Sequence, residues 1–344
     1  MTADRIGVLT AGGDCPGLNA VIRAVTVGGL AAGREVVGIK NGWDGLMQND
    51  TVDLDRDAVR GILGRGGTIL GTSRRDPYVH GAGAASVRET LDAHEIGALI
   101  VIGGDGTLRT ATRLGQEGIH IVGVPKTIDN DIHGTDVTFG FHTAVQIATE
   151  AIDRLTTTAE SHNRIMILEV MGRTAGWIAA TAGMAGGADM ILVPEVPYDL
   201  DEVAAALRGR HQLGRQYSTV VVAEGIEPPS GTISPDREVD LFGFERLGGV
   251  SYVIAPLLEE KTGYEARVTV LGYIQRGGSP TAYDRVLGTR LGLGAVEMAC
   301  AGARDVMVAL SGGQISPVPI DEACREPRLL DRSVYDAAAA FFAS

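Results

Sequence analysis

The stretch "PKTIDND", residues 125–131, packs a lysine, a threonine and two carboxylates together directly after an apolar run. Lys126 is one of three lysines in the whole chain, and it lies close to Asp129 and Asp131. A positioned carboxylate can remove the proton of a hydroxyl group as that group attacks, and a lysine attracts phosphate oxygens. The stretch therefore suits phosphoryl transfer to a hydroxyl group, although a helix cap or an Asx turn would also account for Asp131.

Two glycine-rich turns follow other apolar runs and suit the binding of phosphate. In "TAGGDCPGLNA" (10–20), Gly13 and its neighbours allow backbone N–H groups to approach an anion ahead of a helix. In "GGDGTLRT" (103–110), Asp105 can hold Mg²⁺ and Thr107 begins a helix that can face a phosphate. The structural alternatives are a tight turn in the first case and an Asp-Gly turn before a capped helix in the second.

Three further stretches place arginines beside glycines. Arg74 and Arg75 lie in "ILGTSRRDP" (69–77), and two adjacent arginines suit a polyphosphate, although this stretch taken alone favours an exposed surface pair. The other two stretches are "EVMGRTAGW" (169–177), which contains Met171, Gly172 and Arg173, and "LGYIQRGGSPTAYDR" (271–285), which contains Tyr273 and Arg276. The alternatives there are helix capping by the glycines and surface placement of the arginines.

Other nucleotide-binding motifs are missing from the sequence. The chain has no "GK" dipeptide, which excludes a P-loop, and no G-x-G-x-x-G follows a predicted strand. "GGDGT" also occurs in NAD kinases and diacylglycerol-type lipid kinases, so it indicates phosphoryl transfer without naming the acceptor. Cys15 could be considered a nucleophile, but nothing in the sequence marks a partner base, so we interpret it as a small residue packed in its turn.

Short apolar strands alternate with helix-length segments along the chain. The predicted strands cover 5–10, 35–40, 98–104, 120–125, 164–170, 189–194, 218–225, 266–272 and 305–310. The predicted helices cover 18–32, 86–95, 107–117, 141–157, 174–185, 200–208, 246–261 and 281–302. This alternation predicts an α/β fold with parallel sheets covered on both faces, and nine strands suggest two such sheets. The proline-, glycine- and charge-rich stretch 226–247 is interpreted as a surface excursion.

Composition limits the class of protein. At 344 residues and 44% hydrophobic residues, the chain is long enough for two globular domains. A net charge of −13 argues against a nucleic-acid or acidic-membrane partner, so an anionic ligand must be held by local positive groups. Three cysteines form no disulfide framework, which suggests a reducing cytoplasm. We expect no signal peptide, because the first residues lack a basic segment followed by a long apolar run, and no membrane span, because no apolar run is long enough.

The motifs together resemble the 6-phosphofructokinases. "GGDCPGLNA", "GGDGT", "TIDNDI", "AIDRL", "EVMGRTAGW" and "LGYIQRGGSP" occur in the order and with the spacing of that family, from about residue 5 to residue 310. The resemblance implies two Rossmann-like, three-layer αβα domains with mainly parallel sheets and an active-site cleft between them. A donor-binding domain would comprise 1–140 and 276–325, and a sugar phosphate-binding domain 141–275 and 326–344.

The implied reaction transfers a phosphoryl group to the 1-hydroxyl of fructose 6-phosphate, which gives fructose 1,6-bisphosphate and is the committed step of glycolysis. By the resemblance, Asp129 is the general base, Thr127 and Asp131 support the transferring group, and Arg173 stabilises its growing charge. The residues implied to hold the donor are Gly13, Arg74, Arg75, Gly104, Asp105, Gly106, Thr107 and Lys126, with Asp105 acting through Mg²⁺. Those implied to bind the sugar phosphate are Thr127, Asp129, Arg164, Met171, Gly172, Arg173, Glu224, Arg267, Tyr273 and Arg276.

The family includes ATP enzymes and pyrophosphate enzymes, and this chain has features of both. Pyrophosphate enzymes usually have an aspartate at the position of Gly106 and a lysine at that of Lys126, whereas familiar bacterial ATP enzymes have glycine at both. Because a missing side chain leaves the path of ATP open and a lysine need not block it, we expect ATP, with pyrophosphate as the alternative. A catalytically silent sugar-phosphate sensor would be expected to lose Asp105 or Asp129, and both are present.

Arg164 and Arg267 match arginines that reach the 6-phosphate from a neighbouring subunit, which implies a homo-oligomer with shared active sites, a tetramer with a dimer as the alternative. Tyr273 departs from the histidine of many bacterial ATP enzymes. The family's basic effector pocket is also degenerate: Arg23 and Arg215 match two of its residues. Arginine or lysine is replaced at three other positions by Val27, Thr156 and Gln216, and Arg208 or Arg210 could substitute for the missing charges.

Overall fold

A computed structural model describes residues 5–229 and 247–342. The stretch interpreted as a surface excursion lies for the most part outside the described residues. The chain divides into two compact units. Unit 1 comprises Met1–Ile128, Ile132–Thr143 and Arg276–Pro327, and unit 2 comprises Asp129–Asp131, Ala144–Gln275 and Arg328–Ser344. The predicted domain boundaries fall within three residues of three of these crossings, but the short return at 129–131 was not predicted.

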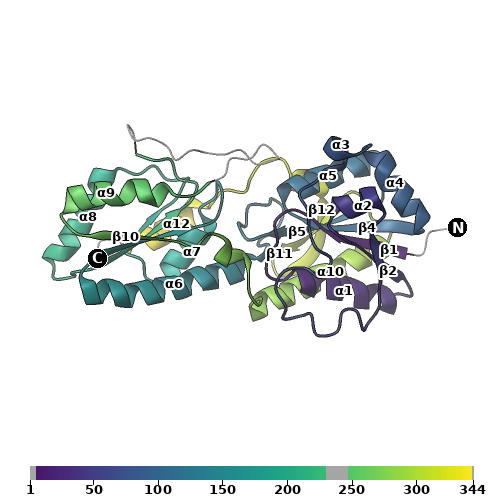
Figure 1. The fold of residues 1–344 in the computed structure, drawn as a ribbon, viewed down its shortest axis with the longest axis horizontal. Coiled ribbons are helices and arrows are strands. Elements are labelled where there is room, and N and C mark those ends of the chain that lie inside the picture. The colour runs from purple at the N-terminus through teal and green to yellow at the C-terminus, as the bar shows by residue number, and fades with distance from the viewer. Residues whose placement is uncertain (1–4, 230–246, 343–344) are drawn as a thin grey trace. The chain divides into compact units, whose positions relative to one another are not determined.

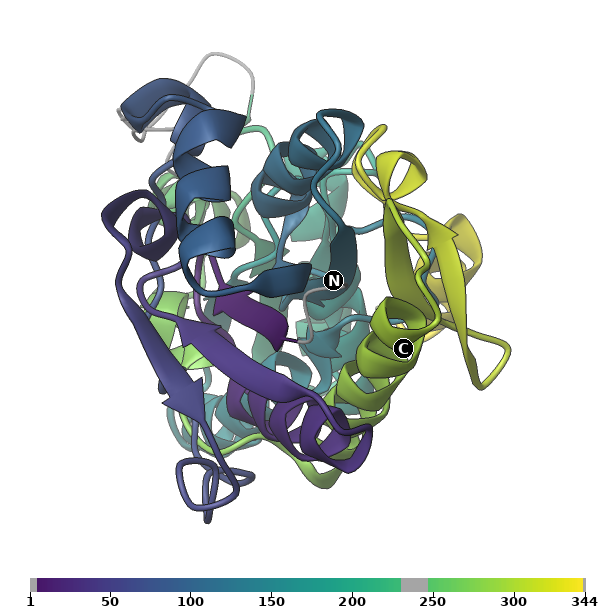
Figure 2. The ribbon, with the colours of Figure 1, turned by 90° about the vertical axis from the view of Figure 1, so that its right-hand side faces the viewer.

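The main sheet of unit 1 has the order β12-β11-β5-β4-β1-β2-β3, with β6 paired to β5 (Figure 2). Its strands are β1 (Arg5–Thr10), β2 (Glu35–Ile39), β3 (Thr51–Leu54), β4 (Ile96–Gly103), β5 (Ile121–Thr127), β6 (Phe139–Gly140), β11 (Val306–Ser311) and β12 (Gln314–Pro319). β3 and β12 run antiparallel to their neighbours, and the other pairs are parallel. The central strands β1, β4 and β5 are almost wholly buried, as continuous apolar runs predict for a sheet covered on both faces.

Helices cover both faces of this sheet, as Figure 2 shows. On one face, α1 (Leu18–Ala31) and α10 (Ala282–Cys300) pack against each other, and on the other lie α4 (Ala84–Ala93) and α5 (Asp105–Gln116). The shorter helices are α2 (Trp43–Gln48), α3 (Pro77–His80) and α11 (Ile320–Ala323). Gly288 and Gly292 allow close packing of the long pair, because a Cβ at Gly292 would lie 2.8 Å from the backbone oxygen of Val21.

Unit 2 has a fully parallel sheet of order β10-β7-β9-β8 (Figure 1). Its strands are β7 (Ile165–Val170), β8 (Met190–Leu192), β9 (Ser218–Ala223) and β10 (Ala266–Val270). Its helices are α6 (Phe141–His162), which begins in unit 1, α7 (Trp177–Ala185), α8 (Leu200–Gln212), α9 (Val250–Thr262), the 3₁₀ turn η1 (Gly272–Arg276), which ends in unit 1, and α12 (Arg332–Ala339). In Figure 1, α9 lies above these strands and α6 below them.

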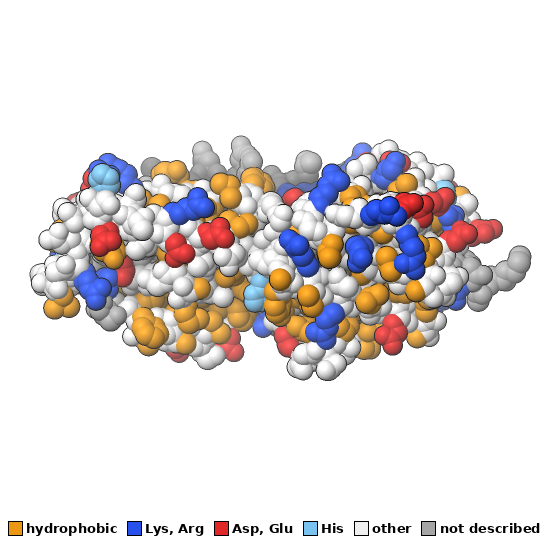
Figure 3. Space-filling view, turned by 90° about the horizontal axis from the view of Figure 1, so that it is seen from below, with side chains coloured by type: hydrophobic (Ala, Val, Ile, Leu, Met, Phe, Trp, Pro, Cys, Tyr) orange, Lys and Arg blue, Asp and Glu red, His pale blue; other side chains and the backbone are white. Residues whose placement is uncertain are grey.

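None of the helices that the structure describes is long and apolar enough to cross a membrane. On the face drawn in Figure 3, basic side chains gather over the right-hand half of the view, and acidic side chains are scattered over both halves.

Candidate active site

The strand order in the sheet of unit 1 reverses at β1: the chain places β2 on one side of β1 and later returns to place β4 on the other side. In parallel α/β sheets, ligands bind at the carboxyl ends of the strands that flank such a switch point. Thr10 at the end of β1 lies opposite Ile102, and Gly103 at the end of β4 lies opposite Pro125 in β5. The two glycine-rich turns and the stretch that contains Lys126 therefore emerge side by side at one edge of the sheet.

Lys126 lies between these turns. Its side chain is buried, and its ammonium group donates a hydrogen bond to the backbone oxygen of Gly13. A Cβ added at Gly12 would lie 3.5 Å from the Lys126 nitrogen, and one at Gly104 would lie 4.0 Å from it. Gly12 has φ +82°, which favours glycine. One buried positive charge is therefore surrounded by backbone from two turns, an arrangement that suits a phosphate.

The N-terminus of α5 carries the candidate metal ligand and the candidate donor determinant. Asp105 opens the helix, and both of its oxygens accept hydrogen bonds from Nε of Arg109, one turn later, at 2.9 and 3.1 Å. A Cβ added at Gly106 would meet nothing within 4 Å. Thr107 faces the first turn, because its Oγ1 would lie 3.3 Å from a Cβ at Gly12. The space beside Gly106 is therefore open, and the Lys126 nitrogen does not fill it.

The arginine pair follows a segment that is bonded to the first glycine turn. The Gly12 N–H donates to the oxygen of Ser73 at 3.0 Å, and Thr72 Oγ1 donates to the oxygen of Gly12 at 2.7 Å. Arg74 is exposed, and Arg75, also exposed, pairs with Asp44 at 3.4 Å. Both guanidinium groups therefore belong to a segment that is hydrogen-bonded to the first glycine-rich turn.

Arg276 also belongs to this group. Its Nη1 donates to the oxygen of Asp14 at 3.3 Å and would lie 2.8 Å from a Cβ at Gly13. The resemblance implied that Arg276 binds the sugar phosphate, whereas this structure places its guanidinium on the turn implied to hold the donor. Cys15, in the same turn, is fully buried with its thiol directed at the oxygen of Phe139, 3.7 Å away. Burial raises the pKa of the Cys15 thiol, which keeps it protonated and supports its interpretation as a packed residue.

The carboxylates of the opening stretch lie in unit 2. Asp129 and Asp131 are both buried, and Asn130 between them has φ +56°. The backbone oxygen of Asp131 accepts a hydrogen bond from the backbone N–H of Arg328 at 2.9 Å, which fixes this short return of the chain. Thr127 remains in unit 1 as the last residue of β5, and its oxygen accepts from Thr138 Oγ1 at 2.8 Å.

Three adjacent strands of unit 2 end beside one another. β7 is followed by Met171, Gly172 and Arg173, β9 by Glu224, and β10 by η1, which contains Tyr273. The Arg173 N–H donates to Glu224 Oε1 at 3.1 Å, and Arg173 has φ +53°. The Met171 N–H donates to Gln275 Oε1 at 2.8 Å. The backbone around Arg173 is therefore held by side chains that follow the neighbouring strands.

Glu224 is a titratable group of this cluster with a raised pKa. Burial, followed by the negative charge of Asp129, raises the pKa of Glu224 to about 7. The hydrogen bonds from the backbone of Arg173 and Gly172 act in the opposite direction. Glu224 therefore changes charge near neutral pH, next to the candidate base.

Arg164 and Arg267 lie at the other end of the same sheet. Arg164 immediately precedes β7 and Arg267 is the second residue of β10, whereas Arg173 follows the carboxyl end of β7. β7 has six residues, which span roughly 20 Å at the usual rise of a strand. The two arginines therefore cannot join Arg173 around one small ligand within unit 2.

The residues implied to hold the phosphoryl donor are compatible with a bound Mg²⁺ ion. No group of three or more His, Cys, Asp or Glu side chains that could hold a metal occurs among the described residues. Magnesium is commonly held by one or two carboxylates together with the phosphates of a substrate. Asp105, at a helix N-terminus beside the glycine-rich turns, provides such a carboxylate.

A family model described as Phosphofructokinase matches residues 5–299. The chain belongs to the phosphofructokinase family. The ATP-dependent 6-phosphofructokinase of Mycobacterium tuberculosis (strain H37Rv) is 53% identical over 341 residues, which are 98% of this chain and 99% of that protein. The pyrophosphate–fructose 6-phosphate 1-phosphotransferase of Streptomyces coelicolor is 51% identical over the same shares of each chain.

Solved structures agree on the fold. A crystal structure of Pichia pastoris phosphofructokinase in the T-state matches 98% of this chain and 36% of that chain, with a TM-score of 0.83 and 32% identity. The pyrophosphate-dependent phosphofructokinase of Marinobacter aquaeolei matches with a TM-score of 0.82 and 23% identity, over 97% of this chain and 91% of that one. The predicted α/β fold with two Rossmann-like domains and mainly parallel sheets is confirmed by these matches.

Two residues that contact candidate site residues were not predicted from the sequence. Arg109 engages Asp105, and the spacing of four residues on a helix that begins with "DG" was the available signal. Gln275 receives the Met171 N–H, and it lies inside the motif "LGYIQRGGSP", in which only the tyrosine and the arginine were singled out.

Proposed function

We propose that the protein transfers a phosphoryl group from Mg·ATP to the 1-hydroxyl of fructose 6-phosphate, giving fructose 1,6-bisphosphate and ADP. Membership of the phosphofructokinase family supports the substrate class, and relatives named for ATP or for pyrophosphate are almost equally similar. The choice of donor therefore rests on the residues of this chain.

The residues at the carboxyl edge of the unit 1 sheet hold the donor. The backbone N–H of Gly13 and the N-terminus of α5 bind its phosphates, and Lys126, Arg74 and Arg75 add positive charge. Asp105 would hold Mg²⁺, which neutralises charge on the donor phosphates. Arg109 pairs with Asp105 in this structure, so it must release the carboxylate to the metal.

The residues of unit 2 and the end of β5 serve the acceptor. Asp129 takes the proton of the attacking 1-hydroxyl, and Thr127 and Asp131 support the transferring group. Arg173 stabilises the negative charge that grows on that group. Met171, Gly172 and Glu224 bind the sugar phosphate. Arg276 lies on the first glycine turn, so we assign its charge to the phosphates held there.

The open space beside Gly106 is the observation that supports ATP. A Cβ added at Gly106 would meet nothing within 4 Å, so no protein side chain occupies the space beside this residue. An aspartate would place a negative charge in that space, against the α-phosphate of ATP. Lys126 is directed at Gly13, so it attracts the phosphates of either donor and does not close the path.

Pyrophosphate is the second candidate, because the chain has the lysine typical of pyrophosphate enzymes and is 51% identical to a relative named for pyrophosphate. Initial rates with fructose 6-phosphate and either Mg·ATP or Mg·pyrophosphate separate the two candidates. We expect turnover with Mg·ATP and at least tenfold less with Mg·pyrophosphate at equal concentration. Comparable or faster turnover with pyrophosphate would reverse the assignment.

We further propose that the active sites are shared between copies of the chain, in a tetramer or a dimer. The support is the position of Arg164 and Arg267, about a strand length from Arg173. A phosphate bound by these arginines must then belong to a sugar held by a second copy.

The three cysteines are free thiols, which suits the proposed location in a reducing cytoplasm.

A further inference from the structure

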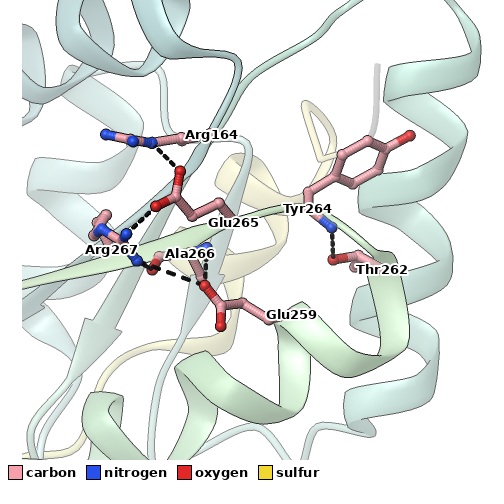
Figure 4. A network of polar contacts seen from close by, with 7 residues as sticks. All are labelled: Arg164, Glu259, Thr262, Tyr264, Glu265, Ala266 and Arg267. Atoms are coloured by element: carbon pink, nitrogen blue, oxygen red, sulfur yellow. Dashed lines mark hydrogen bonds and ion pairs between the residues drawn. The ribbon is translucent and has the colours of Figure 1, made fainter.

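One carboxylate forms ion pairs with two arginines at the amino ends of β7 and β10 (Figure 4). Glu265 is paired with Nε of Arg164 and with Nη2 of Arg267. The arginines come from neighbouring strands, since Ala266 in β10 lies opposite Ile165 in β7. Two guanidinium groups that could bind one phosphate are thus already bound to an acidic group of the same chain.

This cluster is accessible to a ligand. The exposed fractions of the side chains are 30% for Arg164, 38% for Glu265 and 53% for Arg267. The contacts are therefore partly solvated, and each is worth little on its own. A ligand with more charge can replace them without unpacking the core.

Glu265 differs from the second carboxylate of the cluster. Glu259, at the end of α9, accepts a hydrogen bond from the Ala266 N–H at 2.7 Å and lies 3.7 Å from Nη1 of Arg267. It is therefore fixed by the backbone that joins α9 to β10. In the same connection, the Tyr264 N–H donates to Thr262 Oγ1 at 3.2 Å (Figure 4). Glu265 follows this ordered connection, and its carboxylate bridges the guanidinium groups.

The charges in the cluster cancel, because two arginines face two glutamates. A phosphate dianion gains most from a site of net positive charge. When the Glu265 carboxylate moves away, two arginines face only Glu259, and the cluster has a net positive charge. Glu259 stays in place, because it also accepts the hydrogen bond from the Ala266 N–H.

We propose that Glu265 sets the affinity of the Arg164–Arg267 pair for the sugar phosphate. Glu265 occupies both guanidinium groups until the 6-phosphate of a sugar held by a second copy displaces it. A phosphate succeeds because it carries close to two negative charges and three acceptor oxygens, whereas a ligand with one carboxylate only matches Glu265. This inference rests on the proposed sharing of active sites between copies.

The test replaces Glu265 by glutamine, which keeps the shape and removes the competing charge. In the full-length enzyme, E265Q should lower the KM for fructose 6-phosphate by about threefold to tenfold, the range expected for one or two part-exposed ion pairs. Its kcat should stay near the wild-type value. Calorimetry without a phosphoryl donor should show the same gain in affinity for fructose 6-phosphate. E260Q is the matched control, because Glu260 is exposed on α9 and carries the same charge, and its KM should equal that of the wild type.

Arg164→Gln and Arg267→Gln separate this inference from the proposed function. Both should raise the KM for fructose 6-phosphate at least tenfold. If they do and E265Q leaves the KM unchanged or raises it, then Glu265 does not compete with the phosphate, although the shared site stands. If both arginine variants keep the wild-type KM, the shared site itself is wrong and the role of Glu265 falls with it.

Discussion

At the scale of single residues, the candidate base and the candidate donor determinant differ in how the protein surrounds them. Asp129 is buried and close enough to Glu224 for its charge to raise the pKa of that group. Gly106 faces open space at the first turn of α5. A substitution at Asp129 therefore changes the chemistry in a packed site, whereas one at Gly106 adds atoms where a ligand binds.

Asp129→Asn should lower kcat by about 10² to 10⁴, the usual contribution of a general base. The amide fits the same space but cannot take up the proton of the 1-hydroxyl. Calorimetry should show fructose 6-phosphate binding close to that of the wild type. A fall in kcat of less than tenfold would mean that another group acts as the base.

Gly106→Asp should raise the KM for Mg·ATP by about tenfold to a hundredfold, because the new carboxylate repels the α-phosphate. Gly106→Ala is the control, since its methyl group enters open space without charge and should change the KM little. An aspartate in the first turn of a helix is favourable, so the variant should fold. Steady-state kinetics with both donors tests the idea, which unaltered ATP kinetics in the aspartate variant would contradict.

Glu224 gives the protein a pH-dependent stability. The pKa of about 7 in the folded state lies above the usual value of 4.5, so the folded state binds the extra proton. This contribution is fully present below pH 4.5 and is lost as the pH rises through 7. Between pH 5.5 and 8.5, the free energy of unfolding of the wild type should fall by about 2 kcal/mol relative to Glu224→Gln. Parallel urea titrations across this range check the prediction, and parallel pH profiles for the two proteins would refute it.

At the scale of elements, the starts of two helices are held by carboxylates from distant parts of the chain. Asp284, at the start of α10, accepts hydrogen bonds from the N–H groups of Gly140 at 2.9 Å and Thr143 at 2.7 Å, where α6 begins. Glu169 in β7 accepts from Gly249 at 2.6 Å and Ser251 at 2.9 Å, where α9 begins. Each carboxylate satisfies N–H groups that a helix leaves without partners at its first turn.

Asp284→Ala should lower the free energy of unfolding by about 2–4 kcal/mol, because the buried N–H groups of Gly140, just before α6, and Thr143, in its first turn, lose their acceptor. Asp284→Asn retains one acceptor oxygen and should lose about half as much. Denaturant unfolding followed by tryptophan fluorescence measures both variants. Equal stability of the alanine variant and the wild type would show that the start of α6 does not depend on Asp284.

The predicted strands show which elements of the fold a sequence pattern can locate. All nine predicted strands occur, because each is a short, mainly apolar run between turns. The short edge strands β3 and β12 were missed: β3 has four residues, and β12 contains Pro317 and Pro319, which an edge strand tolerates. The glycine turns could be located from their motifs. The approach of Lys126 to Gly13, of Arg276 to Asp14 and of Asp284 to α6 depends on residues more than 100 positions apart, and no local pattern records it.

At the scale of the whole molecule, regulation depends on positive charges that several parts of the chain must supply. The effector pocket of the well-known bacterial enzymes is basic, and this chain has Val27, Thr156 and Gln216 at three of the positions where arginine or lysine is expected. Arg208 and Arg210 could have compensated for that loss. Arg210 is buried and paired with Asp189, and Arg208 donates to the backbone oxygen of Lys261. Both arginines therefore already bind groups within unit 2.

We accordingly predict little response to phosphoenolpyruvate or ADP at millimolar concentration. Three charge-assisted contacts are missing, and even half of their combined contribution corresponds to a loss of affinity of about tenfold to a thousandfold. Freeing Arg210 for an effector would break its ion pair with the partly buried Asp189, which is unfavourable. The measurement is a fructose 6-phosphate saturation curve at fixed Mg·ATP, with and without phosphoenolpyruvate, for the wild type and for Arg23→Ala. The two curves should coincide in each protein. A strong shift to higher fructose 6-phosphate in the wild type that Arg23→Ala abolishes would show a working pocket, in which the remaining arginines suffice to bind the effector.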